Sequence, residues 1–154
     1  RHKRASYITL EEVYPVDGVE FDIYSETPDL LEVLDSEVSE VYYHSALLKS
    51  NCRVTSQPDW GDVYIYIKGE KTVDPISLLK YIVSFRDECH FHEEICETIY
   101  KRLYDLIKPE ELCVRCLYAR RGGIDINPER ASSLDLLHIT LSDPNIPFAK
   151  TPKQ

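Results

Sequence analysis

The chain has 154 residues, of which 43% are hydrophobic and 29% are charged, so it is long enough to form one domain with a sizeable core. Its 27 acidic and 18 basic side chains give a formal net charge of −9. This charge argues against a nucleic-acid surface and against binding to an anionic membrane, because both interactions need clustered basic residues. The sequence shows neither an apolar run of transmembrane length nor a secretory leader.

Two further features of the composition bear on origin and location. The chain begins at Arg1 and contains no methionine, so we expect it to be part of a longer protein. Its five cysteines are an odd number in a chain too large to need a disulfide scaffold. Reduced thiols and a cytoplasmic location are therefore expected.

The first 40 residues are acidic and only weakly patterned. Residues 25–40 contain acidic side chains but no basic one, and residues 19–24 (VEFDIY) have the composition of a short strand. We predict that residues 1–40 form a solvated connector containing one or two short strands, one of them at 19–24.

Stronger periodicity begins at residue 41. Val63, Ile65 and Ile67 alternate with tyrosine and lysine, which is typical of a half-buried strand. Asp74 followed by Pro75 provides an N-cap and a first-turn proline for a helix. The predicted elements are strands at 41–48 and 62–68, helices at 75–83 and 91–107, a strand at 112–120, a turn at Gly122-Gly123 and a return strand at 124–126.

This ββααββ order predicts an α+β fold with an antiparallel sheet, because two consecutive helices between strand pairs do not form alternating βαβ units. Both helices are expected on one face of the sheet. The other face carries tyrosines and charged residues, and a partner could cover it.

The segment 47–63 (LLKSNCRVTSQPDWGDV) carries the first candidates for chemistry. Cys52 lies between Lys49 and Arg53, whose charges are expected to lower the pKa of the thiol. Asp59 lies in the turn that follows. A thiolate and a carboxylate on one loop can attack an electrophile and protonate the resulting anion. The same pattern also suits a small buried cysteine and a turn-forming aspartate.

Two other groups are candidates for ligand contacts. His92 and Glu93 open the second predicted helix, where they could move a proton and hold a ligand, although a carboxylate in a first helical turn also complements the helix dipole. Arg120, Arg121 and Gly122 end a strand at a tight turn. Guanidinium groups beside free backbone N–H groups suit a phosphate, although such pairs are commonly ordinary solvated charges.

Metal binding is weakly supported by the spacing of possible ligands. Cys113 and Cys116 have the spacing of half a zinc site, but residues three apart on a strand point to opposite faces, and there is no second Cys-x-x-Cys pair. His92 and Cys96 are four residues apart on the second predicted helix and could share a face. We expect no metal site.

Three stretches together resemble the C-terminal half of the proteins of one enzyme family. They are LLKSNCRVTSQPDWGDV (47–63), LLKYIVSFRDECHFHEE (78–94) and RRGGIDINPERAS (120–132). The family is that of the queuosine-pathway nitrile reductases, the NADPH-dependent 7-cyano-7-deazaguanine reductases, in their two-module form. The resemblance implies the tunnelling fold (ββααββ), with a connector at 1–40, a catalytic module at 41–132 and a C-terminal tail at 133–154.

The resemblance also implies a reaction and roles for the candidate residues. Cys52 would attack the nitrile carbon of 7-cyano-7-deazaguanine to give a covalent thioimide, and Asp59 would protonate the nitrogen. NADPH would then reduce the thioimide and the following imine to the aminomethyl product used in tRNA modification. His92 and Glu93 would hold the guanine-like edge of the substrate.

The cofactor site implied by the resemblance is only partly present. Arg121 and Gly122 would contact NADPH. The shorter family members have an acidic-Ser-Lys motif at the start of the first helix, but the helix that begins after Asp74 lacks it. In two-module members this motif belongs to the N-terminal module. We therefore expect a second tunnelling-fold module, in the same polypeptide or another subunit, and a homo-oligomer.

Two other functions fit parts of the pattern. One is transfer of ammonia, free or from a glutamine donor, to the same nitrile without NADPH, which would form an amidine. The other is a non-enzymatic module of the same fold that binds a purine or a pterin. The presence of both Cys52 and Asp59 counts against a pure binding module, which needs neither.

Overall fold

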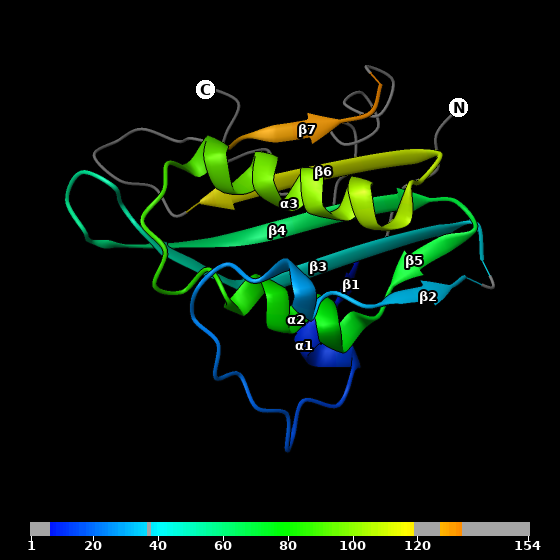
Figure 1. The fold of residues 1–154 in the computed structure, drawn as a ribbon, viewed down its shortest axis with the longest axis horizontal. Helices are drawn as coiled ribbons and strands as arrows, with labels where there is room; N and C mark the ends of the chain where they lie inside the picture. Colours follow the sequence, from blue (N-terminus) through cyan, green and yellow to red (C-terminus); the bar gives the residue numbers. More distant parts are fainter. Residues whose placement is uncertain (1–6, 37, 119–126, 134–154) are drawn as a thin grey trace.

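The computed structural model describes residues 7–36, 38–118 and 127–133, and all structural statements below concern these residues. A five-stranded sheet with strand order β1-β3-β4-β6-β7 lies behind helices α2 and α3 (Figure 1). The strands of this sheet are β1 (Ile8–Thr9), β3 (Glu40–Asn51), β4 (Pro58–Lys68), β6 (Glu111–Tyr118) and β7 (Glu129–Ala131). Each pair of adjacent strands from β3 to β7 in this order is antiparallel, whereas β1 runs parallel to β3.

The two long helices follow a short strand. Strand β5 (Lys71–Val73) pairs with β2 (Val33–Asp35) to form a separate two-stranded sheet. Helix α2 (Pro75–Val83) begins as predicted, because the Asp74 carboxylate accepts a hydrogen bond from the Ser77 N–H at 2.8 Å. Helix α3 (His92–Ile107) ends at Lys108, whose φ of 45° lies in the left-handed region.

The main core lies between one face of the sheet and the two helices. The alternation at Val63, Ile65 and Ile67 is confirmed, since all three side chains are buried in this core. The core residues contributed by the helices are Leu78, Leu79, Tyr81, Ile82, Ile95, Cys96, Ile99, Leu103 and Ile107. The α+β fold with an antiparallel sheet and both helices on one face is therefore as predicted.

A bulge divides β3 into two parts with different inward-facing residues. Tyr43 and Ser45 are buried before the bulge, and Leu48 and Ser50 are buried after it, so the inward-facing positions change from odd to even numbers. The register to β4 shifts between Ser45 and Leu48. The carboxylate of Glu11 accepts a hydrogen bond from the bulged N–H of Ala46 at 2.7 Å.

The N-terminal segment differs from the prediction in two respects. Residues 19–24 form no strand; the short strands of this segment are β1 and β2, and the segment also contains α1 (Leu10–Val13) and a 3-10 helix (Pro28–Leu30). The described edges of β3 and β5 pair with β1 and β2. The segment is also less solvated than expected, because Leu10 and Leu31 are buried in the main core.

The face of the sheet opposite the helices carries the expected tyrosines and charges. The rings of Tyr42 and Tyr66 lie 4.8 Å apart, and the Tyr66 hydroxyl donates to Glu40. Arg115 forms a buried ion pair with Glu129 at 3.2 Å. The predicted return strand at 124–126 lies outside the described residues, and β7 follows it. Among the described helices, none has the length and apolar character needed to cross a membrane.

Candidate active site

Cys52 lies in the turn that joins β3 to β4, at one end of the sheet. The Cys52 N–H donates to the Gln57 carbonyl at 2.8 Å, and the Ser56 N–H donates to the Cys52 carbonyl at the same distance. Ser56 has a φ of 60°, which lets the chain reverse within this short loop. These two bonds close the loop around a half-buried thiol.

The pKa of the Cys52 thiol is lowered, as predicted, but the cause differs from the prediction. The thiolate is stabilised first by hydrogen bonds from the N–H and hydroxyl groups of Thr55, and then by the N–H of Val54. The cations expected to do this have other partners. The Arg53 guanidinium lies 3.3 Å from the Glu94 carboxylate, and the Lys49 ammonium lies 3.4 Å from the Arg86 carbonyl oxygen.

This cause can be tested with Thr55→Val, which removes the hydroxyl donor and keeps the backbone N–H. We expect the pKa of Cys52 to rise, because the thiolate loses one of its hydrogen bonds. Alkylation of Cys52 by iodoacetamide at neutral pH should then slow, and its pH profile should move to higher pH. Peptide mass spectrometry measures the rate, with the exposed thiol of Cys89 as an internal reference. An unmoved pH profile would exclude the Thr55 hydroxyl as a cause.

Asp59 and His92 form a pair beside this turn. Asp59 lies on β4, is only 4% exposed and faces the helix side of the sheet. The His92 Nε2 atom, at the start of α3, lies 3.2 Å from the Asp59 Oδ2 atom. The negative charge of Asp59 also acts on the Cys52 thiol, where it raises the pKa against the stronger effect of the turn. The structure thus brings together three predicted site residues from two distant segments.

Glu93 lies next to His92 but has a different environment. Its carboxylate is exposed on the first turn of α3. Together with Asp59 it contributes to raising the pKa of the buried Tyr118 hydroxyl, although burial itself is the main cause. His92 and Glu93 therefore place one ring and one accessible carboxylate at the same helix end, where the helix dipole favours an anion.

The loop before α3 is joined to the end of β3. The Asn51 N–H donates to the Glu88 carbonyl at 2.8 Å, and the His90 N–H donates to the Asn51 carbonyl at 3.2 Å. These bonds pair β3 with the Glu88–His90 loop, including the isolated bridge between Asn51 and Cys89. They explain how the Cys52 turn and the start of α3 come together.

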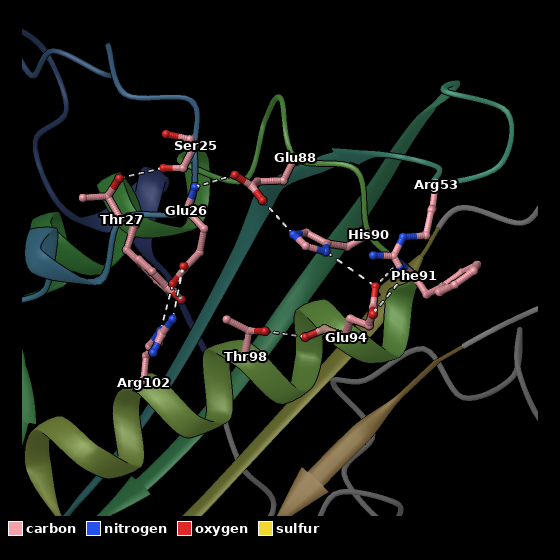
Figure 2. A network of polar contacts seen from close by, with 11 residues as sticks. Ser25, Glu26, Thr27, Arg53, Glu88, His90, Phe91, Glu94, Thr98 and Arg102 are labelled. Carbon is pink, nitrogen blue, oxygen red and sulfur yellow. Dashed lines mark hydrogen bonds and ion pairs between the residues drawn. The ribbon is translucent and has the colours of Figure 1, made fainter.

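Charged side chains extend this connection through contacts that the sequence did not predict. Figure 2 shows His90 between the carboxylates of Glu88 and Glu94, at 2.6 and 3.5 Å, with Arg53 on the far side of Glu94. The Glu94 side chain also accepts a hydrogen bond from the Phe91 N–H at 2.9 Å, which lowers the pKa of Glu94. An acidic residue at the third helical position is a capping signal that the sequence contained.

The N-terminal segment is attached to the same network through Glu26. The Glu26 N–H donates to the Glu88 carboxylate at 3.0 Å, and its own carboxylate accepts from Arg102 at 3.0 Å and from the Tyr81 hydroxyl at 2.7 Å. Figure 2 shows the Arg102 contact from the middle of α3. Glu26 thus connects the N-terminal segment to both helices and to the loop that carries His90.

The remaining candidates do not converge on a metal site in the described part of the chain, where no group of three or more His, Cys, Asp or Glu side chains could hold an ion. Cys113 packs near Tyr66 on the open face, whereas Cys116 is buried in the main core, as expected for opposite faces of a strand. The Cys96 thiol donates to the Val114 carbonyl. Arg121 and Gly122 lie outside the described residues.

Comparison with known proteins places the chain in a family. A family model described as "QueF-like protein" matches residues 58–134, which is half of the chain. The chain belongs to the QueF-like protein family. The matched region includes Asp59, His92 and Glu93, and Cys52 lies just before it. The family resemblance inferred from the sequence is therefore confirmed.

Two curated relatives of this QueF-like chain are both named NADPH-dependent 7-cyano-7-deazaguanine reductase. The relative from Colwellia psychrerythraea is 42% identical over 145 residues, which are 90% of this chain and 47% of the relative. The relative from Coxiella burnetii is 45% identical over 115 residues, which are 75% of this chain and 41% of the relative. The chain thus spans less than half the length of these relatives.

A solved structure supports the fold. The crystal structure of the archaeosine synthase QueF-Like in the apo form superimposes with a TM-score of 0.59. The match covers 63% of this chain and 96% of that chain, at 16% sequence identity. The likeness confirms the predicted tunnelling fold.

Proposed function

We propose that this chain is the nucleophile-bearing half of an NADPH-dependent 7-cyano-7-deazaguanine reductase, which acts in queuosine modification of tRNA. The observation that carries this proposal is the half-buried Cys52, whose pKa is lowered, beside the buried pair of Asp59 and His92. A nitrile is a weak electrophile, so its reduction benefits from a covalent nucleophile and a nearby proton donor. The names of the two curated relatives support the substrate and the cofactor.

The first step would join the substrate to the chain. The Cys52 thiolate attacks the nitrile carbon, and one C–N bonding pair moves to the nitrogen. The Asp59 carboxylate, which would take up a proton from solvent before this step, gives that proton to the nitrogen; this leaves a neutral thioimide and returns Asp59 to the carboxylate form beside His92 Nε2. NADPH, when bound, supplies the hydrides; two of them and two protons convert the nitrile to the aminomethyl group, and the thiolate is released.

Substrate selection is assigned to the start of α3. The exposed Glu93 carboxylate can accept hydrogen bonds from a ring N–H and an exocyclic amino group at once, which is the donor pair on the edge of a guanine-like base. His92 lies beside it and is 15% exposed, so part of its ring also reaches the surface of the site. These two residues would hold the heterocycle while its nitrile points toward Cys52.

The described residues provide only part of a site for NADPH. Near Cys52 the Arg53 side chain is paired with Glu94, and Lys49 is bonded to the Arg86 carbonyl. A dinucleotide needs further cations and a surface for the nicotinamide. We assign these to Arg121 and Gly122, which lie outside the described residues, and to a second module.

A second tunnelling-fold module also accounts for exposed apolar side chains around the site. Val54, Trp60 and Phe91 are 77%, 46% and 44% exposed. They come from the Cys52 turn, the start of β4 and the start of α3, and such a group suits a covering partner. In this proposal residues 1–40 are the connector, 41–132 the catalytic module and 133–154 a tail. The cytoplasmic location and the homo-oligomer stay predictions.

The test is an assay of NADPH oxidation on addition of 7-cyano-7-deazaguanine, first with the chain alone and then with the first module of a two-module relative added in trans. We expect little activity from the chain alone and a rise of about 10²-fold on addition, because nicotinamide misplacement by about an ångström has an effect of this size. Full activity of the monomeric chain would contradict the need for a partner. Nitrile consumption that needs ammonia and no NADPH would instead indicate amidine formation.

A further inference from the structure

The ring of Tyr118 lies against His92; the sequence patterns did not single out this residue, and the proposed mechanism gives it no role. The His92 and Tyr118 rings are stacked, with centroids 3.8 Å apart and planes only 8° from parallel. Tyr118 is the last residue of β6 and is 7% exposed. The imidazole therefore has a flat, fixed support on one side and the Asp59 carboxylate at its edge.

The Tyr118 ring has room at this position because the residue paired with it on β4 is a glycine. Gly61 pairs with Tyr118 across β4 and β6, and a Cβ atom at Gly61 would lie 3.0 Å from the Tyr118 Cδ1 atom. The Tyr118 ring thus lies close to Gly61, and a side chain at Gly61 would have to push the ring aside. The Tyr118 N–H also donates to the Asn127 side chain at 3.3 Å.

Three contacts then determine the orientation of the imidazole: the stack on Tyr118, the Nε2 contact with Asp59 and its position as the first residue of α3. In this orientation the His92 Nδ1 atom is buried and has no hydrogen-bond partner among the described residues. The stack and the Asp59 contact are therefore the side-chain contacts that hold the ring.

We propose that Tyr118 is a positioning residue for His92, and that Gly61 is required because it leaves room for the Tyr118 ring. This inference rests on the proposed function, since it concerns the pair that would hold the substrate and its proton donor. The ring is the effective part of Tyr118. Its hydroxyl is buried and has no hydrogen-bond partner in the described part of the chain, so it adds nothing to the orientation of His92.

The experiment compares three variants by the rate of adduct formation at saturating 7-cyano-7-deazaguanine without NADPH. It uses the preparation, with the first module where needed, in which the wild-type chain forms the adduct. Tyr118→Phe keeps the ring and removes an unpartnered hydroxyl, so we expect a near wild-type rate and equal or higher thermal stability. Tyr118→Leu and Gly61→Ala should each slow the adduct by about tenfold or more and change its pH profile.

Two controls separate positioning from general damage. Alkylation of Cys52 by iodoacetamide should stay at the wild-type rate in all three variants, because the Thr55 turn is unchanged. Tyr64→Leu removes a second tyrosine–histidine contact, to His44 at 4.6 Å on the other face of the sheet, and should leave the adduct rate unchanged. Gly61→Ala keeps the test informative if Tyr118→Leu does not fold.

The outcomes are distinct. A wild-type adduct rate in both Tyr118→Leu and Gly61→Ala would overturn the inference and leave the proposed function intact. Equal losses in Tyr118→Phe and Tyr118→Leu would also overturn it, because the hydroxyl and not the ring would then matter. A wild-type chain that forms no adduct in any preparation contradicts the proposed function, and this inference fails with it.

Discussion

Incubation with 7-cyano-7-deazaguanine in the absence of NADPH is expected to raise the intact mass of the chain by one substrate mass, and Cys52→Ala is expected to abolish this adduct. The reason is that attack by the thiolate needs no reductant, whereas release of the substrate as amine does. The lowered pKa of Cys52 increases the fraction of thiolate at neutral pH. The adduct should therefore form readily near pH 7 and more slowly in acid.

The matched control for this substitution is Cys89→Ala. Cys89 is an exposed thiol on the loop bridged to the end of β3, so it shares solvent access and location but not the hydrogen bonds of the Thr55 turn. The adduct should persist in Cys89→Ala and map to the peptide containing Cys52. An adduct that survives Cys52→Ala would show that another group is the nucleophile.

Asp59→Asn is expected to lower turnover by about 10²-fold or more while the fold persists. The amide has nearly the shape of the carboxyl group, and its oxygen can still accept a hydrogen bond from His92 Nε2, so the pair keeps its geometry. What the substitution removes is the proton that the nitrile nitrogen requires. Steady-state kinetics and a thermal melt on the same sample separate these effects.

A second aspartate on the same strand provides the control. Asp62 also contacts a histidine, His44, at 3.3 Å, but its side chain belongs to the opposite face of the sheet. Asp62→Asn should therefore leave turnover unchanged although it makes the same chemical change in a similar pair. Unchanged turnover in Asp59→Asn would remove Asp59 from the mechanism.

Local patterns in the sequence predicted the elements that depend on local causes. The alternation at Val63, Ile65 and Ile67 marks β4, and Asp74 with Pro75 marks the start of α2. The strand predicted at 41–48 from its β-forming residues is shorter than β3, which continues to Asn51, because the polar residues 49–51 give no local strand signal and are held in β3 by pairing with β4. The strand predicted at 19–24 is wrong because a strand-like composition says nothing about whether a sheet edge is available.

The candidate site was likewise predictable where its residues lie in local sequence patterns, and not where contacts join distant segments. Cys52, Asp59, His92 and Glu93 belong to short stretches with a family pattern, so the sequence alone marks them as candidates. The real donors to the thiolate were missed, because a loop's backbone direction at Thr55 is not visible in residue types, whereas the charges of Lys49 and Arg53 are. Tyr118 was missed because its contact with His92 depends on β6 pairing with β4 beneath α3.

The bulge in β3 separates two requirements that one continuous strand would have to meet together. The part up to Ser45 places Tyr43 in the hydrophobic core, and the part after Leu48 leads into the turn that bears Cys52. An insertion or deletion within the bulge would turn Leu48 and Ser50 away from the helices, since strand side chains alternate between faces. Insertions and deletions should therefore be tolerated poorly at residues 46 and 47. They should be tolerated much better in the loop around Gly18, where a Cβ atom would meet nothing within 4 Å.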